Sequence, residues 1–354
     1  MRGMEGRLPR TPTLADESYL SFYEGVRNFA IGEMFPDVAT RIVQAAEAAG
    51  LPDAGAGAPL DELVRTADAL PAVATWKRVM RSQQHASWRR IRDSLLADAA
   101  RHEAELSSAE RARPGRLHCD PAFVTPDYAK FEIHLQPGGY VGDELAGYVF
   151  HHGTKVFYQG LNDQDELHHA VASYVRAPAD GRLQRILDVG CSIGQATTAL
   201  KERFPEAEVH GLDVARPMLR YAHKRATDLG IDVHFHQGLA EALPFPDGHF
   251  DAVLAYILFH EVPSRLFAPI VAEFARVLRP GGTLTVVDAA NGQRYPAPNR
   301  VWLQFDAKYN CEPYQPGFVS CDLRGLLEQA GFAVQSVEPT PTFLWCTSAT
   351  KPGG

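Results

Sequence analysis

The stretch ILDVGCSIGQ, at residues 186–195, decides the fold of this chain. Its apolar first half is typical of an interior parallel strand, and its second half places Gly190 and Gly194 where the chain turns sharply before a helix. Glycine lets the backbone of such a turn lie close against a ligand. A second predicted strand ends at Asp213, whose carboxylate is placed to accept hydrogen bonds from both hydroxyls of a ribose. These two strands therefore predict a site for a nucleoside cofactor.

A glycine-rich turn also occurs in dinucleotide-binding folds, so the turn alone leaves two classes of cofactor open. A nicotinamide site needs a third glycine near the start of the helix to admit a pyrophosphate. Here Cys191 and Ser192 occupy the turn, and the helix begins at Gln195. The turn shows no evident phosphate cradle, which favours a cofactor without a pyrophosphate.

Strands and helices alternate from this turn to the end of the sequence. The helix at 217–229 has Pro217 at its start and Gly230 after its end, and further helices are expected at about 264–278 and 322–330. Strands are expected at about 183–189, 208–214, 232–239, 250–257, 283–289, 333–338 and 342–350. The pattern predicts an α/β fold with a Rossmann-like sheet of seven strands, the last two adjacent without a helix between them.

Several sequence motifs, in their order along the chain, resemble those of class I S-adenosylmethionine-dependent methyltransferases. The resemblance is to the small-molecule branch, which includes quinone and sterol methylating enzymes. The matching pieces are LDVGCSIG (187–194), GLDVARPML (211–219), GLAEALPFPD (238–247), FDAV (250–253) and LRPGGTLTV (278–286). The resemblance covers roughly residues 150–350. It implies S-adenosylmethionine as the cofactor and methyl transfer to oxygen or carbon, less often nitrogen, of a small metabolite.

The resemblance also implies which residues bind the cofactor. Gly190, Ser192 and Gly194 would lie under its methionine and ribose parts, and Asp213 would hold the ribose hydroxyls. The predicted cofactor-binding residues are Asp188, Gly190, Cys191, Ser192, Gly194, Gln195, Asp213, Val214, Met218, Gly238, Leu239, Ala240 and Tyr256.

Adenine recognition departs from the family pattern at one position. Val214 and Met218 would pack against the adenine, and Leu239 and Ala240 would flank its edge. The family often has an acidic residue where Leu239 stands, hydrogen-bonded to the adenine amino group. Backbone groups or another side chain must make that contact in this chain.

A general base is needed only where the acceptor loses a proton, and His260 is the first candidate. It follows the fourth predicted strand, at the edge where ligands collect in open parallel sheets, and an imidazole pKa near neutrality suits proton removal. Glu261 is expected to orient His260 or to act in its place. His152 and Tyr158, with His151, are further candidates from the segment 134–169, which is expected to fold over the cofactor. The alternative is that His260 only caps the loop after the strand.

Two regions are expected to shape the acceptor pocket. Residues 1–150 are predicted to form a mainly helical cap, with helices at 16–34, 37–49 and about 72–110, and residues 151–354 the cofactor-binding catalytic domain. An insertion at 290–320 is expected to close the pocket over a mostly apolar or aromatic acceptor. Its aromatic residues, which are alternatively core at a domain interface, are Tyr295, Trp302, Phe305, Tyr309, Tyr314 and Phe318.

Other functions remain as alternatives. A nucleic-acid-binding protein that uses the basic helix 76–92 is one alternative. Acidic residues further along favour an ordinary solvated helix surface instead. The Pro-Pro-Tyr signature of base-methylating enzymes is missing, since AYILFHEVP (255–263) stands in its place. A protein that binds the cofactor for a reaction other than methyl transfer is a third alternative. We predict no metal, because adjacent histidines on a strand point to opposite faces and each pair supplies one ligand.

Composition agrees with a soluble intracellular enzyme, and the family resemblance implies a cytoplasmic enzyme that methylates small molecules in secondary metabolism. The chain has 354 residues and a net charge of -8, which argues against nucleic acid and acidic membranes as partners. Its five cysteines have no paired spacing, which argues against a disulfide framework. No stretch reaches the roughly 18 uncharged apolar residues of a membrane span, and no secretory signal is expected. A homodimer is compatible with the sequence, which leaves the oligomeric state open.

Overall fold

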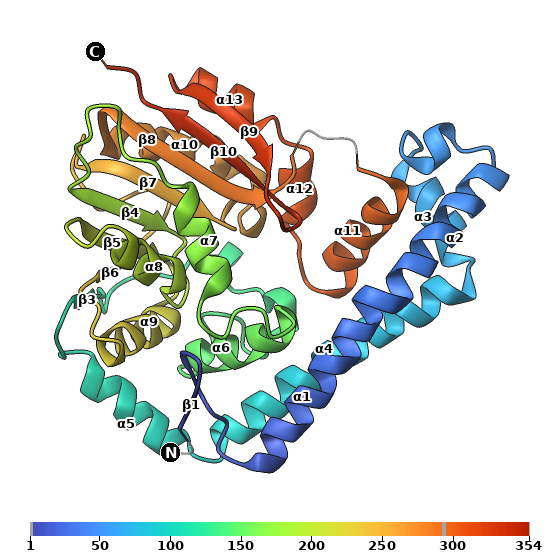
Figure 1. Cartoon of the computed structure of the whole chain (residues 1–354), viewed down its shortest axis with the longest axis horizontal. Helices are drawn as coiled ribbons and strands as arrows, with labels where there is room; N and C mark the ends of the chain where they lie inside the picture. The colour runs from blue at the N-terminus through green and yellow to red at the C-terminus, as the bar shows by residue number, and fades with distance from the viewer. Residues whose placement is uncertain (1–2, 292–294, 354) are drawn as a thin grey trace.

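A mixed sheet of eight strands occupies one end of the molecule (Figure 1). The computed structural model describes residues 3–291 and 295–353. The strand order is β3-β6-β5-β4-β7-β8-β10-β9. All pairs from β3 to β8 are parallel, and β10 runs antiparallel to both β8 and β9. The strands are β3 (Arg116–His118), β4 (Arg185–Val189), β5 (Glu208–Asp213), β6 (His234–Gln237), β7 (Phe250–Tyr256), β8 (Leu278–Ala289), β9 (Ala333–Pro339) and β10 (Leu344–Thr350).

The predicted Rossmann-like α/β fold is confirmed, with one strand more than the seven expected. The additional strand β3 lies at the edge of the sheet and pairs with β6. Its three residues are too few to show an alternating pattern, so the sequence did not reveal it.

Helices cover both faces of the sheet, because successive apolar side chains of its strands point to opposite faces and both must be buried. In β4, Ile186 packs toward α7 (Glu166–Tyr174), α8 (Gln195–Arg203) and α9 (Arg216–Asp228). Its neighbour Leu187 packs on the opposite face toward α10 (Phe267–Val277), α12 (Gln315–Val319) and α13 (Leu323–Gln329). Both faces are therefore buried, and the carboxyl ends of β4 and β5 form the edge where a ligand can bind.

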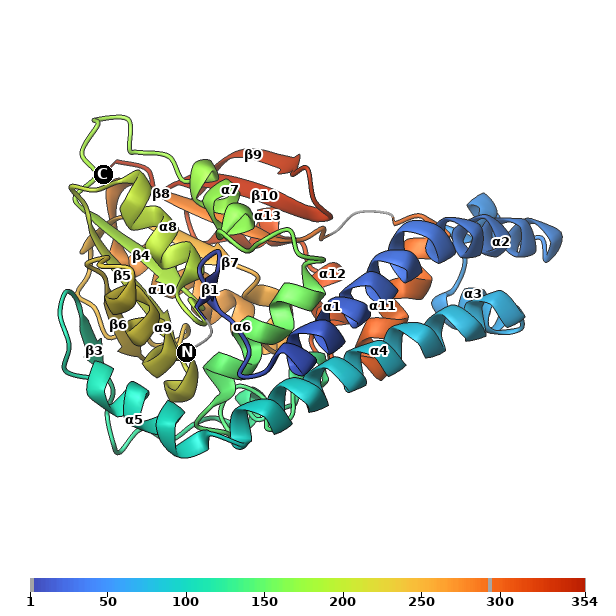
Figure 2. The ribbon, with the colours of Figure 1, turned by 60° about the horizontal axis from the view of Figure 1, so that its bottom comes forward.

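A helical arm extends away from the sheet (Figures 1 and 2). We define it as α1 (Leu14–Phe29), α2 (Phe35–Ala48), α3 (Leu60–Asp68), α4 (Pro71–Leu96) and α11 (Ala297–Tyr309). Although α11 comes from the predicted insertion, it packs in the core of the arm, where Trp302 lies 4.5 Å from Phe35 and 5.0 Å from Trp76 between ring centroids. Two distant parts of the chain thus build one unit; residues 292–294 of the insertion lie outside the described residues.

The helix predicted at about 72–110 is two helices. Helix α4 ends at Leu96, and α5 (Ala99–Ala109) begins after Asp98, whose backbone leaves the helical region. The basic residues of α4 are partly engaged within the fold, because Lys77 pairs with Asp68 at 2.6 Å and Arg90 with Asp16 at 2.6 Å. These pairs weaken the interpretation of α4 as an RNA-docking face.

Histidines gather where β3, β5 and β6 lie side by side. The rings of His118 and His236 stack with centroids 4.6 Å apart, and Nδ1 of His210 lies 3.0 Å from Nε2 of His236. Burial, and then the neighbouring histidines, lower the pKa of His210 and His236 to about 3. Both side chains are therefore neutral in the folded protein at physiological pH.

We expect this cluster to make the protein less stable in mild acid. The unfolded chain binds protons on these histidines below about pH 6.5, while the folded chain does not, so their stabilising contribution is complete above that pH and is lost as the pH falls. The loss by pH 5 is on the order of 2 kcal/mol from His210 alone. Urea unfolding at pH 7.5 and pH 5 measures it. A His210→Gln, His236→Gln double variant should lose clearly less stability over this range, and an equal loss would contradict the assignment.

Candidate active site

A cavity of about 970 Å³ runs from the glycine-rich turn to the helical arm. Its cofactor end lies at the carboxyl ends of β4 and β5, and its acceptor end lies beneath α4, α6 (Ala146–Phe157) and α11. Walls of the acceptor end are largely aromatic and apolar, with a few ionisable groups among them. The residues that line this end include Ile31, Phe35, Met80, Trp88, His134, Tyr140, Phe150, Phe157, Tyr158, His260, Glu261, Trp302, Asp306 and Glu312.

The glycine-rich turn has the conformation that its sequence predicts. Gly190 and Gly194 have φ of +78° and +73°, and Ser192 between them has φ of +50°. The amides of Gly190 and Cys191 both donate to the carbonyl of Leu212, at 2.8 and 3.0 Å, which fixes the turn against β5. A Cβ atom on Gly194 would lie 2.6 Å from the ring of Phe235.

Gly194 therefore serves the packing of the turn and does not line the cavity as a ligand contact. Leu239 is also absent from the cavity wall; it forms an isolated bridge with Ala242. The predicted cofactor contacts of these two residues stay predictions, because neither residue lines the cavity in this structure. The other predicted residues line the cavity, namely Asp188, Gly190, Cys191, Ser192, Gln195, Asp213, Val214, Met218, Gly238, Ala240 and Tyr256.

Asp213 ends β5 beside the turn. Its Oδ2 accepts from the amide of Ser192 at 2.8 Å and its Oδ1 from the amide of Ala215 at 2.9 Å. Burial raises the pKa of Asp213, while these backbone donors oppose the shift. Each carboxylate oxygen retains a further acceptor site, which suits a pair of ribose hydroxyls.

We expect Asp213→Ala to weaken S-adenosylmethionine binding by roughly 1.5 to 3 kcal/mol, since it removes the charged acceptor from buried hydroxyl groups. The same substitution removes the partners of two backbone amides, so Asp213→Asn, which keeps an acceptor oxygen, is the matched variant and should lose less. Isothermal titration calorimetry with the cofactor and its demethylated product measures both. Unchanged affinity in Asp213→Ala would remove this residue from the site.

Two unpaired polar atoms in the wall of the cofactor end are available to a ligand with an ammonium group and hydroxyls. Asp188 accepts from the hydroxyl of Thr197 at 2.7 Å through Oδ2, but its buried Oδ1 has no hydrogen-bond partner. The hydroxyl of Ser192 is also buried without a partner. Burial raises the pKa of Asp188 to about 7. A cofactor that carries an ammonium group and hydroxyls is able to satisfy both side chains.

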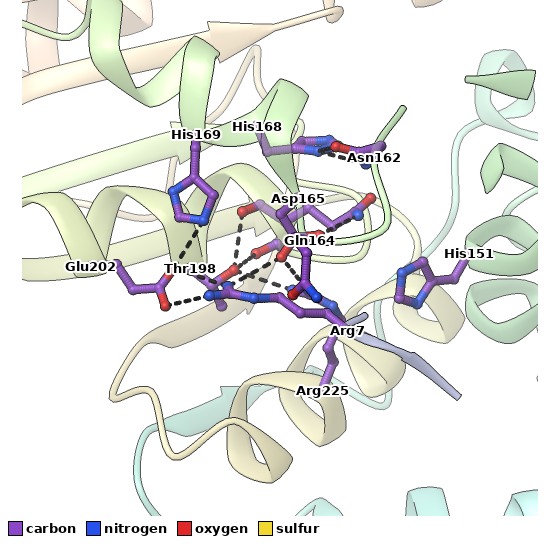
Figure 3. Close-up of polar contacts among 12 residues, drawn as sticks. Arg7, His151, Asn162, Gln164, Asp165, His168, His169, Thr198, Glu202 and Arg225 are labelled. Atoms are coloured by element: carbon purple, nitrogen blue, oxygen red, sulfur yellow. Dashed lines mark hydrogen bonds and ion pairs between the residues drawn. The ribbon is translucent and has the colours of Figure 1, made fainter. Parts of the chain in front are cut away.

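Gln195 is held from behind by a buried ion pair. Its Nε2 donates to Oδ1 of Asp165 at 2.7 Å, and Asp165 pairs with Arg225 and, at 3.3 Å, with Arg7 (Figure 3). Arg7 belongs to the hairpin of β1 (Met4–Glu5) and β2 (Leu8–Pro9), and it also binds Glu202 of α8 at 2.7 Å. The N-terminal hairpin is thereby tied to the helices behind the cofactor end.

His260 lies at the acceptor end, on the 3-10 turn Phe259–Glu261 that follows β7. Its Nδ1 is hydrogen-bonded to Oδ1 of Asp288, which also accepts from the amide of Ala289 at 2.7 Å. Burial lowers the pKa of His260, but Asp288 and then Glu261 outweigh it and raise the pKa to about 10. The pair with Asp288 therefore favours the protonated imidazolium of His260, in contrast to the expected pKa near neutrality. It is suited to donate a hydrogen bond to an acceptor oxygen.

Asp288, rather than Glu261, orients His260. Oε1 of Glu261 lies 4.0 Å from Nε2 of His260 and 3.7 Å from Nε2 of His134. Burial and the neighbouring Glu312 raise the pKa of Glu261 to about 7. Sequence reasoning missed Asp288, although a lone acidic residue at the carboxyl end of an apolar strand was a signal for it.

Only Tyr158 of the candidates from the segment 134–169 reaches the cavity. The segment 146–157 is a helix, so Phe150, Thr154 and Phe157 share the cavity face at helical spacing. His152 lies on another face and is buried outside the cavity wall, where burial lowers its pKa to about 4. Its neighbour His151 places Nδ1 2.8 Å from the hydroxyl of Tyr221. His152 is therefore not positioned to act on an acceptor, and the strand assumed for the histidine pairs was wrong.

Comparisons with known proteins match the part of the chain that contains the glycine-rich turn. Residues 186–282 match a family model described as a methyltransferase domain. A demethylmenaquinone methyltransferase of Thermus thermophilus is 44% identical over 105 residues, 30% of this chain and 47% of that protein. A fatty-acid O-methyltransferase of Mycolicibacterium smegmatis is 38% identical over 132 residues, 36% of this chain and 47% of that protein. These two alignments span about half of the length of each relative.

A third alignment extends over most of a relative. An O-methyltransferase of Penicillium expansum is 33% identical over 230 residues, which are 62% of this chain and 76% of that protein. The similarity therefore reaches well beyond the glycine-rich turn and its two strands.

Proposed function

This chain belongs to the class I S-adenosylmethionine-dependent methyltransferases, and we propose that it methylates an oxygen or carbon atom of a small, mostly apolar or aromatic metabolite. The family's cofactor is S-adenosylmethionine. One observation supports the acceptor class: the cavity that contains Asp213 and the glycine-rich turn continues without interruption into an aromatic chamber beside His260. Such walls suit an apolar or aromatic ligand with few polar atoms.

The residues of the cavity contribute alignment and charge. When bound, S-adenosylmethionine would supply a methyl group that its sulfonium already activates for transfer, with the sulfur as leaving group. Asp213 and the turn hold one reactant, and the aromatic walls hold the other and exclude water. Protonated His260 favours an acceptor oxygen that binds as an anion, such as a phenolate, enolate or carboxylate. The acceptor's proton is then lost before transfer, and no side chain has to remove it.

Incubation of the protein with methyl-labelled S-adenosylmethionine tests this proposal. The acceptor panel should contain phenols, hydroquinones and long-chain carboxylic acids, followed by an extract of the source organism. We expect label in a small, organic-soluble product with one methyl group added, identified by mass spectrometry. Label only in protein or RNA, or no label although calorimetry shows cofactor binding, would contradict it.

The proposal makes the partner a small molecule rather than a nucleic acid or a membrane. The ion pairs of Lys77 and Arg90 on α4 argue against a nucleic acid as the partner, because they occupy basic side chains of that helix. Among the residues that the structure describes, no helix has the length and apolar character needed to cross a membrane. A homodimer stays a prediction, which sedimentation of the full chain would test.

A further inference from the structure

Three side chains at the acceptor end come together from three separate segments. His134 comes from the 3-10 turn Ile133–Leu135, Glu261 from the turn after β7, and Glu312 from the loop after α11. One ring nitrogen of His134 and one carboxylate oxygen of each glutamate all lie within 4.8 Å of one another. We propose that these three residues form a binding site for a divalent cation of the Mg²⁺ and Mn²⁺ class.

Glu312 is the observation that points most directly to a cation. Its side chain is 2% exposed and lines the cavity, yet neither carboxylate oxygen accepts a hydrogen bond. Its Oε1 forms a close ion pair with Nδ1 of His134 at 2.5 Å, whereas its buried Oε2 has no partner. Buried carboxylates without donors are unfavourable unless a cation compensates them.

The surrounding structure holds His134 in position. Nε2 of Gln84 and Nε1 of Trp88, both on α4, donate to the carbonyl of His134 at 2.6 and 2.7 Å. His134 itself has φ of +55°, and Cys311, directly before Glu312, has φ of +56°. Non-glycine residues in this left-handed region are strained, and such strain is maintained where surrounding contacts fix a functional side chain. Helix α4 of the helical arm thus fixes the backbone of His134, one of the three proposed ligands.

The ligand set selects the class of cation. Two carboxylates favour Mg²⁺ or Mn²⁺, and Mn²⁺ is the better match where an imidazole completes the set. Three protein ligands leave coordination positions that face the cavity, open to water or to an acceptor oxygen. A cation there would polarise that oxygen beside His260, which narrows the acceptor to a hydroxyl or carboxylate compound. This last step rests on the proposed function, whereas cation binding rests on the three ligands alone.

Electron paramagnetic resonance of Mn²⁺ tests the site on the full, chelator-treated chain without cofactor or acceptor. Free Mn²⁺ gives a sharp signal, and we expect the wild type to remove about one equivalent of it. Glu312→Gln and Glu261→Gln should each weaken Mn²⁺ binding about tenfold or more. Glu328→Gln, on the exposed side of α13, is the matched control and should bind like the wild type. Circular dichroism confirms that each variant is folded, and Glu261→Gln carries the test if Glu312→Gln does not fold.

Two results would overturn the proposal: no loss of the free Mn²⁺ signal with the wild type, or unchanged affinity in both glutamine variants. The outcome is separable from methyl transfer. A wild type that methylates an acceptor but binds no Mn²⁺ rejects the cation site and keeps the proposed function. A wild type that binds Mn²⁺ through Glu261 and Glu312 but transfers no methyl group supports the site and rejects the function.

Discussion

His260→Ala is expected to lower the turnover of the acceptor about 100-fold while leaving the affinity for S-adenosylmethionine nearly unchanged. The reason is that His260 lines the acceptor end, where Asp288 holds its imidazole in place and keeps it protonated. Alanine removes the hydrogen-bond donor that faces the acceptor but none of the groups around Asp213. Turnover at saturating cofactor, together with calorimetry of cofactor binding, measures the two effects separately.

Two further variants decide between His260 and the other candidates. His152→Gln changes a buried histidine outside the cavity and should retain turnover, whereas Tyr158→Phe removes a hydroxyl from the cavity wall. A loss below about threefold in His260→Ala, with Tyr158→Phe inactive, would transfer the role to Tyr158. If all three variants remain active, alignment alone drives the transfer.

Asp165→Ala is expected to destabilise the protein by about 3 to 5 kcal/mol. Asp165 is completely buried, and it pairs with Arg225, whose side chain is 4% exposed, as well as with Arg7. Alanine would leave the buried guanidinium of Arg225 without its anion (Figure 3). It would also leave the side-chain amide of Gln195 without its acceptor. The free energy of unfolding in urea measures this loss.

The matched control for Asp165 is an exposed ion pair. Asp228 of α9 pairs with Lys224 on the surface, so Asp228→Ala should cost less than about 1 kcal/mol. Asp165→Asn keeps the shape of the side chain and should fall between the two. A change below about 1 kcal/mol in Asp165→Ala would show that the ion pair contributes little to stability.

The sheet and the cofactor end were largely predictable because both depend on local sequence. An apolar strand, a turn that requires positive φ at Gly190 and Gly194, and an acidic residue at the end of the next strand leave few alternatives. The break of the long helix near Asp98 was not predictable, since neither proline nor glycine marks it. Strand β3 was also missed, because its identity depends on pairing with β6 rather than on its own residues.

The acceptor end could be predicted only in part. His260 and Glu261 follow a recognisable strand. Asp288 lies on the neighbouring strand β8, and Glu312 lies in the loop after α11 of the helical arm. Contacts between segments so distant in sequence leave no periodic signal. His152 shows the opposite error, because a conspicuous histidine pair faces away from the cavity once the segment is a helix.

The shared construction of the helical arm limits how this enzyme can acquire new acceptors. Trp76 and Phe35 come from the first hundred residues, whereas Trp302 and Phe305 come from the insertion more than two hundred residues later. All four pack in one core. Exchange of either segment alone with a homologue would bring mismatched aromatic surfaces together. A change of acceptor by exchange with a homologue therefore requires replacement of both segments together. Replacement of one segment alone would preserve the cofactor end of the cavity but disrupt its acceptor end.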